Sequence, residues 1–389
     1  MPLFGIFNIA VSFLLIITFP LVCKVTKDHW DDNRYAAISG LAAGFSMLIA
    51  GIYMLVRSIP VFYWSITATT QAETEMAFIL STLQPIPFPF SSFVFYFGCF
   101  VMTFLMAFWA IELKRKKYLD AKEVELEVDS LDIEVSRKLF HICIIGVIVC
   151  YLLVGKLVSE AVFDTVYTLF NQYFSGTQAY YINPVTLSAR NMGQGVTIFI
   201  FMAIFILIFF TDLIRIYRFR FYPLKELAYV YRNKERSVLG PHVYLLGGAL
   251  FAVVLFPGPI AISAIAMAGF GDAMATITGV SIGKHKLKPL GKYESNKTWE
   301  GCIGGIIGSM AFGTISYIFV GFVWYADVGL SPVNIIVTGL ILNAIGTLVF
   351  FLADYFTPPL KISDNILNPT LIPFVQFIVA VLLFPYLIV

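Results

Sequence analysis

Apolar runs long enough to cross a lipid bilayer recur along the whole of this 389-residue chain. A transmembrane helix needs about 17–25 mainly apolar residues, and lipid offers its backbone no hydrogen-bond partners, so each run is expected to be helical. Charged residues make up 13% of the chain, about half the share usual in soluble domains. We therefore predict an all-α polytopic bundle of about ten transmembrane helices, near residues 3–22, 36–56, 91–111, 138–154, 196–214, 241–256, 258–271, 301–324, 333–353 and 371–388. The sixth and seventh runs are short, and the seventh is expected to continue past Asp272 toward Gly283.

The basic residues are divided unequally between the two sides of these predicted spans. Of the 26 lysines and arginines, only Arg57, Lys156 and Arg190 follow an even-numbered span. The positive-inside rule then places the odd-numbered loops in the cytoplasm and both termini on the opposite side. The net charge of +2 is too small to indicate a nucleic-acid partner.

Residues 271–301 combine a carboxylate, glycines and lysines between two apolar runs. Asp272, Ala275, Gly279 and Gly283 recur at helical spacing on one face. Small residues in this pattern commonly serve close helix packing, which is one interpretation of the glycines. Packing does not account for Asp272, because a carboxylate entering hydrocarbon costs about 2.5–3.5 kcal/mol and needs a cation or a polar cavity.

The lysine-rich connection that follows leads into the start of another helix. Lys284 and Lys297 flank this connection, and Asn296 or Thr298 is placed to cap the helix that begins there. A helix N-terminus beside a lysine is an anion site, although a lysine-rich loop is also typical of simple attraction to anionic lipid. We interpret Asp272, the lysines and this helix start, with Glu300 and Gly301, as a place for a metal-bound triphosphate.

A second polar stripe is predicted at the start of the fourth span, in EVSRKLFH. Glu134, Arg137, Lys138 and His141 fall at i, i+3, i+4 and i+7, on one helical face. Arg and Lys at a membrane boundary often only extend toward water, and a lone His is more often a structural hydrogen-bonding group. An inward-facing stripe that balances phosphate charge is the interpretation we favour.

Further candidates lie on the same side of the predicted bundle: Glu235, Asp354, Asp364 and Asn365. Mg²⁺ prefers oxygen ligands, commonly one or two carboxylates together with substrate phosphates. The acids therefore suit phosphoryl transfer at the cytoplasmic face. Asp212 and Arg215, at i and i+3, are expected to pair with each other instead.

At these residues the chain resembles the CTP-dependent polyprenol kinases: dolichol kinases most closely, then phytol kinases and CTP-using diacylglycerol kinases. The pattern D-x-x-A-x-x-x-G-x-x-x-G, a lysine-rich spacer and K-T-x-E-G matches Asp272, Ala275, Gly279, Gly283, Lys297, Thr298, Glu300 and Gly301. The family's E-x-x-R-K-x-x-H falls on Glu134 to His141, and its later D-N with a proline resembles Asp364, Asn365 and Pro369. The chain departs from the pattern at Asn296, where a second lysine is usual, and at Asp354, where a glutamate is expected.

This resemblance implies a lipid kinase that transfers the γ-phosphate of CTP to the hydroxyl of dolichol or another polyprenol. Mg²⁺ would be held by Asp272, with Glu300 or Asp364, and the phosphates by Lys297 and the following helix start. Lys138 and Arg137 would neutralise charge, and Asp364 or Asp272 would accept the hydroxyl proton. The catalytic part would span residues 134–389, after N-terminal helices and a linker in 1–133. The active site would face the cytoplasm, from a cell membrane or from the endoplasmic reticulum.

Three alternatives stay open. The lysine-rich spacer also resembles phosphatidate cytidylyltransferases, but residues 340–389 lack the C-terminal K-R…K-D…P-G-H-G-G…D-R-x-D block of that family. The lipid acceptor can equally be phytol or diacylglycerol, because a groove for any lipid tail is built of the same apolar residues. A transporter would need a site near the middle of the membrane, often with inverted repeats, and neither is evident.

Overall fold

The computed structural model describes residues 5–31, 33–82, 84–87, 90–114, 189–223, 237–287, 297–326 and 329–387. Within these ranges the chain is α-helical and has no β-strand. The α-helices are α1 (Ile6–Asp28), α2 (Arg34–Thr67), α3 (Gln71–Thr82), α4 (Phe90–Lys114), α7 (Ala189–Tyr217), α8 (Pro241–Leu255), α9 (Gly258–Ile282), α10 (Trp299–Trp324), α11 (Pro332–Leu360) and α12 (Asp364–Leu383). Single 3₁₀ turns follow α7 (Phe219–Phe221) and α12 (Pro385–Leu387).

Eight of the described helices are long and apolar enough to cross a membrane, which confirms the predicted all-α polytopic bundle. The helix α8 is apolar but has only 15 residues, about 22 Å of helix against a hydrocarbon layer of about 30 Å. It ends where Pro257 and Pro259 interrupt the chain, and α9 then continues past Asp272 to Ile282 as expected. The predicted fourth span, 138–154, lies outside the described residues.

Several helix ends differ from the prediction. The helix α2 runs to Thr67, and the separate helix α3 was not predicted. The helix α12 begins at Asp364 instead of near residue 371, because the Ser363 hydroxyl caps it by accepting a hydrogen bond from the Asn365 N–H. Pro369 and Pro373 therefore lie inside α12, as membrane helices tolerate.

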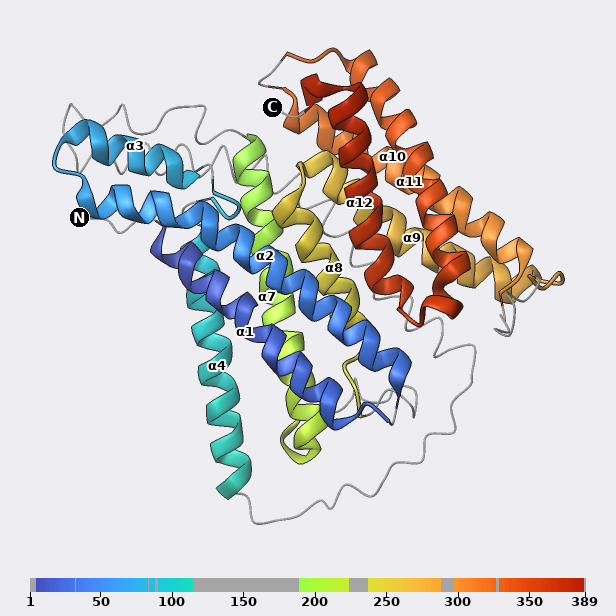
Figure 1. Cartoon of the computed structure of the whole chain (residues 1–389), viewed down its shortest axis with the longest axis horizontal. Helices are drawn as coiled ribbons and strands as arrows, with labels where there is room; N and C mark the ends of the chain where they lie inside the picture. The colour runs from blue at the N-terminus through green and yellow to red at the C-terminus, as the bar shows by residue number, and fades with distance from the viewer. Residues whose placement is uncertain are drawn as a thin grey trace.

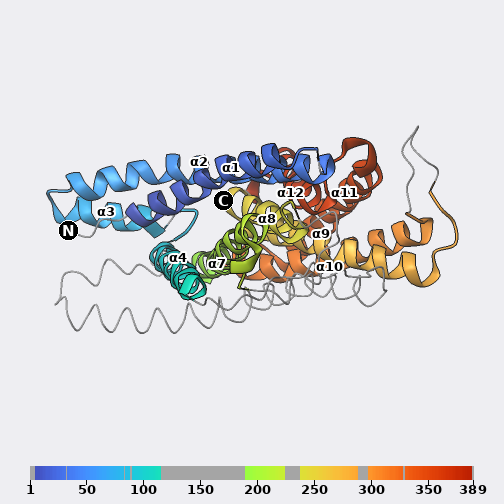
Figure 2. The same cartoon turned by 90° about the horizontal axis from the view of Figure 1, so that it is seen from below.

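The helices pack as a bundle in which α8 occupies the centre. It contacts α2, α7 and α12, and the buried core extends through it from α1 to α12. Figure 1 shows the chain passing from the N-terminal helices α1, α2 and α4 to the C-terminal group α9–α12. In the perpendicular view, α1 and α2 lie along one face of the bundle, and α4, α7 and α10 lie along the other (Figure 2).

The closest helix pair is α9 with α10, and small residues make this approach possible. A Cβ added at Gly301 would lie 2.9 Å from the Ala275 carbonyl oxygen, and one at Gly305 would lie 3.0 Å from the Ala275 Cβ. Gly279 faces Gly301 and Thr298 across the same contact. The glycine spacing of the sequence thus serves packing, which was one of the two interpretations of these residues.

A buried ion pair attaches the end of α7 to the chain before α8. Arg215 Nε donates to Asp212 Oδ1 (2.5 Å), as the spacing predicted. The second Asp212 oxygen accepts from the Gly240 N–H (2.8 Å), and Arg215 also donates to the Val238 carbonyl (2.6 Å). Both Asp212 oxygens and two of the Arg215 nitrogens therefore hold the end of α7 against this chain.

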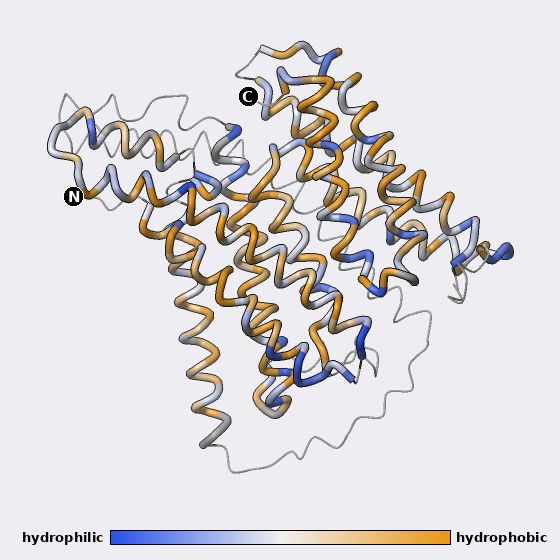
Figure 3. The backbone as a smooth tube through the Cα atoms, in the orientation of Figure 1, coloured by the Kyte–Doolittle hydropathy of each residue, from blue (hydrophilic) through white to orange (hydrophobic). Residues whose placement is uncertain are grey.

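Hydrophilic residues lie mainly near the ends of the helices, including α3 and the start of α7, whereas the helices between the ends are largely apolar (Figure 3). One such group of helix ends lies around the α1–α2 turn. Two hydrogen bonds join helix ends there: Tyr217 on α7 donates to Asp28 on α1 (2.9 Å), and the Ser363 N–H donates to Ser39 on α2 (2.8 Å). The α1–α2 turn, the end of α7 and the α11–α12 turn thus lie on the same side. We call this side the polar end.

Candidate functional site

The candidate site lies at the polar end and is built around Lys297. This lysine directly precedes α10, whose N-cap is Thr298, and its ammonium donates to Asp354 near the end of α11. The contacts are with the Asp354 carbonyl oxygen (2.8 Å) and with the carboxylate oxygen Oδ1. Asp354 is buried, at 8% exposure, and a buried carboxylate needs such a partner.

Two further carboxylates act on the same ammonium. Burial alone would lower the pKa of Lys297, but the charges of Asp354, Asp364 and Asp272 outweigh it and raise that pKa above its ordinary value. Asp272 belongs to α9, Asp354 to α11 and Asp364 to α12. Acids from three helices and the lysine before a fourth therefore converge at one place.

Asp364 is the first residue of α12, where unpaired backbone N–H groups favour a negative charge. Its Oδ1 accepts hydrogen bonds from the Asn365 N–H (2.9 Å) and from the Ser363 hydroxyl (3.4 Å). The predicted Asn365 thus takes part through its backbone. The helix start fixes the Asp364 carboxylate relative to Lys297.

The formal charges of this group do not cancel. Three carboxylates act electrostatically on one ammonium, so these four side chains together carry a formal charge of −2. Among the described residues, no three His, Cys, Asp or Glu side chains are close enough to hold a metal ion by themselves. Oxygen donors in this number suit Mg²⁺, which commonly takes one or two carboxylates and completes its shell with phosphates and water.

The position of Lys297 is fixed by pairing of the two ends of its loop. Lys286 and Thr298 form an antiparallel bridge, in which the Leu287 N–H donates to the Lys297 carbonyl (2.9 Å) and the Trp299 N–H to the His285 carbonyl (2.8 Å). Thr298 Oγ1 accepts from the Gly301 N–H (3.2 Å), so of the two expected caps it is Thr298 that starts α10. The lysine is held at a helix N-terminus as the sequence predicted.

Glu300 has a different partner from the one expected. Its carboxylate accepts hydrogen bonds from the His285 N–H (3.2 Å) and contacts His285 Nδ1 (2.6 Å). This contact closes the base of the loop, and the predicted role of Glu300 as a magnesium ligand stays a prediction. Because Trp299 and Glu300 both bond His285, this contact orients the first turn of α10.

The other predicted nucleotide-binding residues fall into two groups. Gly279, Gly283 and Gly301 lie in the α9–α10 contact, each within reach of Thr298 or of the opposing backbone. Lys284 is exposed beside them, at the end of α9. The glycines bring the lysine-bearing loop close to α9, and Lys284 is accessible to an anion.

Five predicted residues lie outside the described part of the chain: Glu134, Arg137, Lys138, His141 and Glu235. Their roles stay predictions from the sequence.

The structure adds Tyr35, which the sequence gave no reason to select. It lies in the first turn of α2, where the Ser39 hydroxyl donates to its carbonyl oxygen (2.8 Å) and accepts from the Ser363 N–H (2.8 Å). The signal in the sequence was weak, since a tyrosine beside Asn33 and Arg34 at a membrane boundary is typical of any interfacial helix end.

Comparison with protein-family models, with curated proteins and with solved structures found no match to this chain. A functional assignment therefore rests on the residues and on their geometry.

Proposed function

We propose that this protein is a membrane-embedded lipid kinase that transfers the γ-phosphate of CTP to the hydroxyl of dolichol or a related polyprenol. The observation that carries the proposal is the convergence of Asp272, Asp354 and Asp364 on the Lys297 ammonium at one end of the bundle. Asp272 and Lys297 come from one motif and Asp364 from another that is far away in the sequence, and both motifs resemble those of the CTP-dependent polyprenol kinases. Asp354 stands where that family is expected to have a glutamate.

The reaction joins the lipid oxygen to the γ-phosphorus. The bond between that phosphorus and the oxygen bridging it to the β-phosphate breaks, and CDP leaves with the electron pair. The hydroxyl proton passes to a carboxylate and then to water. Such transfer depends mainly on positioning and on electrostatic stabilisation of the phosphoryl oxygens.

Each residue of the site has a function in this scheme. Lys297 and the first N–H groups of α10 bind phosphate oxygens. Asp272 and Asp364 would be the oxygen ligands of Mg²⁺, which would shield the charge of the triphosphate. Asp354 holds the Lys297 ammonium in place, and Asp364 or Asp272 accepts the proton.

The membrane arrangement supports a lipid acceptor. The site is at the ends of apolar helices that carry many exposed large hydrophobic side chains, among them Ile277, Ile303 and Leu352 near the polar end. A polyprenol tail would lie against such surfaces, with its hydroxyl at the boundary with water. The positive-inside rule places this boundary on the cytoplasmic side, where CTP is found.

A transporter is the competing hypothesis from another class. A transport site is expected near the middle of the membrane, whereas the described carboxylates lie at helix ends: Asp354 near the end of α11 and Asp364 at the start of α12. This placement favours chemistry at the surface of the membrane over passage through it.

The test is an assay of the purified protein in detergent with radiolabelled CTP and a panel of lipid alcohols: dolichol, phytol and diacylglycerol. We expect label on one of these lipids, with release of CDP. Asp272→Asn should abolish transfer, because it removes a charge that the metal-bound triphosphate requires. Asp31→Asn is the matched control, since the Asp31 side chain is 88% exposed in the α1–α2 turn.

Both variants should elute from gel filtration as wild type does, which separates a loss of chemistry from a loss of folding. Full transfer by a folded Asp272→Asn protein would refute the role of this carboxylate. In a parallel assay with phosphatidate as acceptor, formation of CDP-lipid with release of pyrophosphate would identify a cytidylyltransferase.

A further inference from the structure

An arginine and a tryptophan meet at the end of the bundle opposite to the polar end. The first residues of α7 and the last residues of α10 lie there, because the other ends of these helices, Tyr217 and Thr298, belong to the polar end. The Arg190 guanidinium lies over the Trp324 ring, 4.3 Å from the ring centroid. Few basic residues are expected on this side, and Arg190 is one of only three that follow an even-numbered predicted span.

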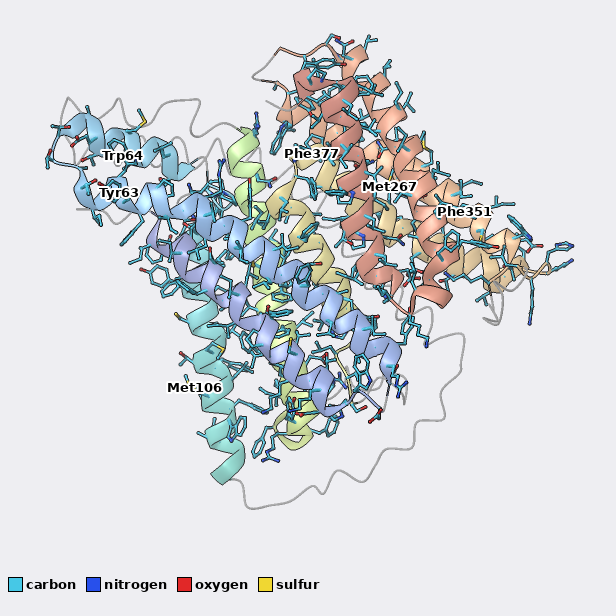
Figure 4. All side chains as sticks on the ribbon, in the orientation of Figure 1. Tyr63, Trp64, Met106, Met267, Phe351 and Phe377 are labelled. Carbon is cyan, nitrogen blue, oxygen red and sulfur yellow. The ribbon has the colours of Figure 1, made fainter. Side chains whose placement is uncertain are left out.

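The indole N–H of Trp324 has no hydrogen-bond partner among the described residues. The side chain is 6% exposed, and its Nε1 atom is buried. A buried tryptophan N–H usually donates to an acceptor, because an unpaired donor loses its hydrogen bonds to water without replacement. Trp64 differs, since it lies beside α3 with 41% exposure, as is typical of a membrane-interface anchor (Figure 4). An acceptor atom is therefore expected beside Trp324, next to the guanidinium.

Two more polar side chains follow Arg190 on the same face of α7. Gln194 and Thr197 stand at i+4 and i+7 from it. Gln194 Nε2 donates to the Val253 carbonyl at the end of α8 (2.6 Å), so this face of α7 is directed toward α8 and α10. Within the described ranges, the buried Gln194 Oε1 and Thr197 Oγ1 have no partner. An amide oxygen can only accept a hydrogen bond, so Gln194 calls for a donor.

We propose that Arg190, Trp324 and Gln194 form a binding site for the headgroup of a glycerophospholipid, in the leaflet opposite to the candidate kinase site. The phosphate oxygens accept from the guanidinium and from the indole N–H, and the planar fork of an arginine matches the geometry of a phosphate. A hydroxyl or ammonium group of the same headgroup donates to Gln194 Oε1. This site is separate from the proposed kinase function.

The position of these residues favours a lipid over a free anion. The helices α7 and α10 are long enough to cross a membrane, and their ends lie where phospholipid headgroups lie. Positions four apart on a helix are about 5–6 Å apart at Cβ, so Arg190 and Gln194 can contact two parts of one headgroup. The neighbouring Trp324 ring covers the guanidinium.

The test measures binding of phosphatidylglycerol, labelled with a fluorophore on its acyl chain, to the purified protein in detergent without CTP. We expect saturable binding that Arg190→Gln weakens by about tenfold or more, the effect of losing a hydrogen bond between charged groups. Trp324→Phe keeps an aromatic ring and removes the N–H, so it should weaken binding by a smaller factor. Arg57→Gln and Trp64→Phe are the matched controls, since both side chains are exposed on α2, and they should bind as wild type does.

Competition against the labelled lipid identifies the ligand. Unlabelled phosphatidylglycerol should displace the label, whereas phosphatidylcholine, whose headgroup has no hydrogen-bond donor, should displace it less well. Equal displacement by phosphatidylcholine would overturn the role of Gln194 as an acceptor. Displacement by inorganic phosphate at the same concentration would overturn the assignment to a lipid, because a free oxyanion would then be the ligand.

Gel filtration and thermal unfolding show whether each variant is folded. If Trp324→Phe does not fold, Arg190→Lys takes its place: lysine keeps the charge without the planar fork, so binding should weaken less than in Arg190→Gln. Equal affinity in the site variants and in the control variants would overturn the site. Binding that does not saturate would also overturn it, since the label would then only be dissolving in the detergent around the helices.

Discussion

At the scale of single residues, the site depends on one ammonium held among carboxylates. Lys297 is only partly buried, with 31% of its side chain exposed, whereas its partner Asp354 is almost inaccessible. The loop base and the Thr298 cap fix the lysine backbone. The protein thus presents a positive charge at the edge of a negatively charged group, where a phosphate would meet it.

The pH dependence of stability follows from this contact. The pKa of Lys297 is raised in the folded protein, so its protonated form stabilises the fold. This contribution is complete below the ordinary lysine pKa of about 10.4 and is lost as pH rises through the higher folded value. We expect the thermal unfolding midpoint to fall above about pH 10.4, measured on purified protein in detergent.

Lys297→Arg is the control for this titration, because arginine stays protonated to about pH 12 or above. The variant should lose less stability than wild type across the same range. Identical alkaline profiles for the two proteins would show that other groups control the loss.

The residues of the site were partly predictable from the sequence. Motif spacing and helix-capping rules identified Lys297, Thr298, Asp272 and Asp364. In the structure, the charges of Asp272 and Asp364 act on the Lys297 ammonium. The contact of Lys297 with Asp354 joins positions 57 apart, and no local rule encodes such a contact. The contact of Glu300 with His285 joins positions 15 apart and was likewise not predicted.

At the scale of helices, the site depends on how closely α9 and α10 approach. The loop that bears Lys297 joins these two helices, so their separation sets its position. Gly301 is the point of contact with the backbone of α9, where the Ala275 carbonyl leaves no space for a side chain. Helix packing in a membrane relies on such close contacts.

Gly301→Ala should therefore be destabilising. The new methyl group would lie 2.9 Å from a backbone oxygen that cannot move alone, and overpacking of this kind costs about 1–3 kcal/mol. We expect a lower unfolding midpoint in detergent and a reduced transfer rate, since Lys297 would shift with α10.

Gly98→Ala is a matched change inside α4, where the nearest atom to an added Cβ is Ile206 Cδ1 at 3.7 Å. Alanine is the better helix former by about 0.5–1 kcal/mol, so this variant should be as stable as wild type or more stable. A Gly301→Ala protein that behaves in the same way would contradict the packing role.

The helices themselves were more predictable than their ends. Nine of the ten predicted spans fall among the described residues, and a helix lies at each of them. Hydropathy locates these helices because a segment that crosses lipid must be a long apolar helix. The start of α12 was placed too late, because the Ser363 cap and the contact with Ser39 set the actual start. Capping and tertiary contacts decide helix ends, and hydropathy does not report them.

At the scale of the whole molecule, the N-terminal and C-terminal helices form one bundle around α8. The helix α2 packs against α8 and contacts α12, and Tyr244 on α8 donates a hydrogen bond to the Ala36 carbonyl on α2 (2.9 Å). The polar end thus combines helix ends from both halves of the chain. Among the described residues, the helix ends and turns on this side carry Lys27, Arg218 and Lys361.

The basic residues at the polar end lead to a prediction about orientation in the membrane. The α9–α10 loop at the polar end should face the cytoplasm, and α3, which follows the opposite end of α2, should face away from it. Single cysteines report these sides when the five native cysteines are replaced by alanine. Lys286→Cys and Ala72→Cys suit the purpose, since both positions are exposed to solvent or headgroups.

Sealed vesicles of each orientation are treated with a maleimide that does not cross membranes, and labelling is measured on the purified protein. The cysteine at position 286 should react in inverted vesicles, whose cytoplasmic face is outward. The cysteine at position 72 should react in right-side-out vesicles. Detergent should expose both positions in either preparation, which controls for buried thiols. The reverse pattern would place the site on the side that lacks CTP, and the kinase proposal would then have no phosphate donor. Labelling of both positions from the same side would show that α2 does not cross the bilayer, which would contradict the bundle arrangement on which the site depends.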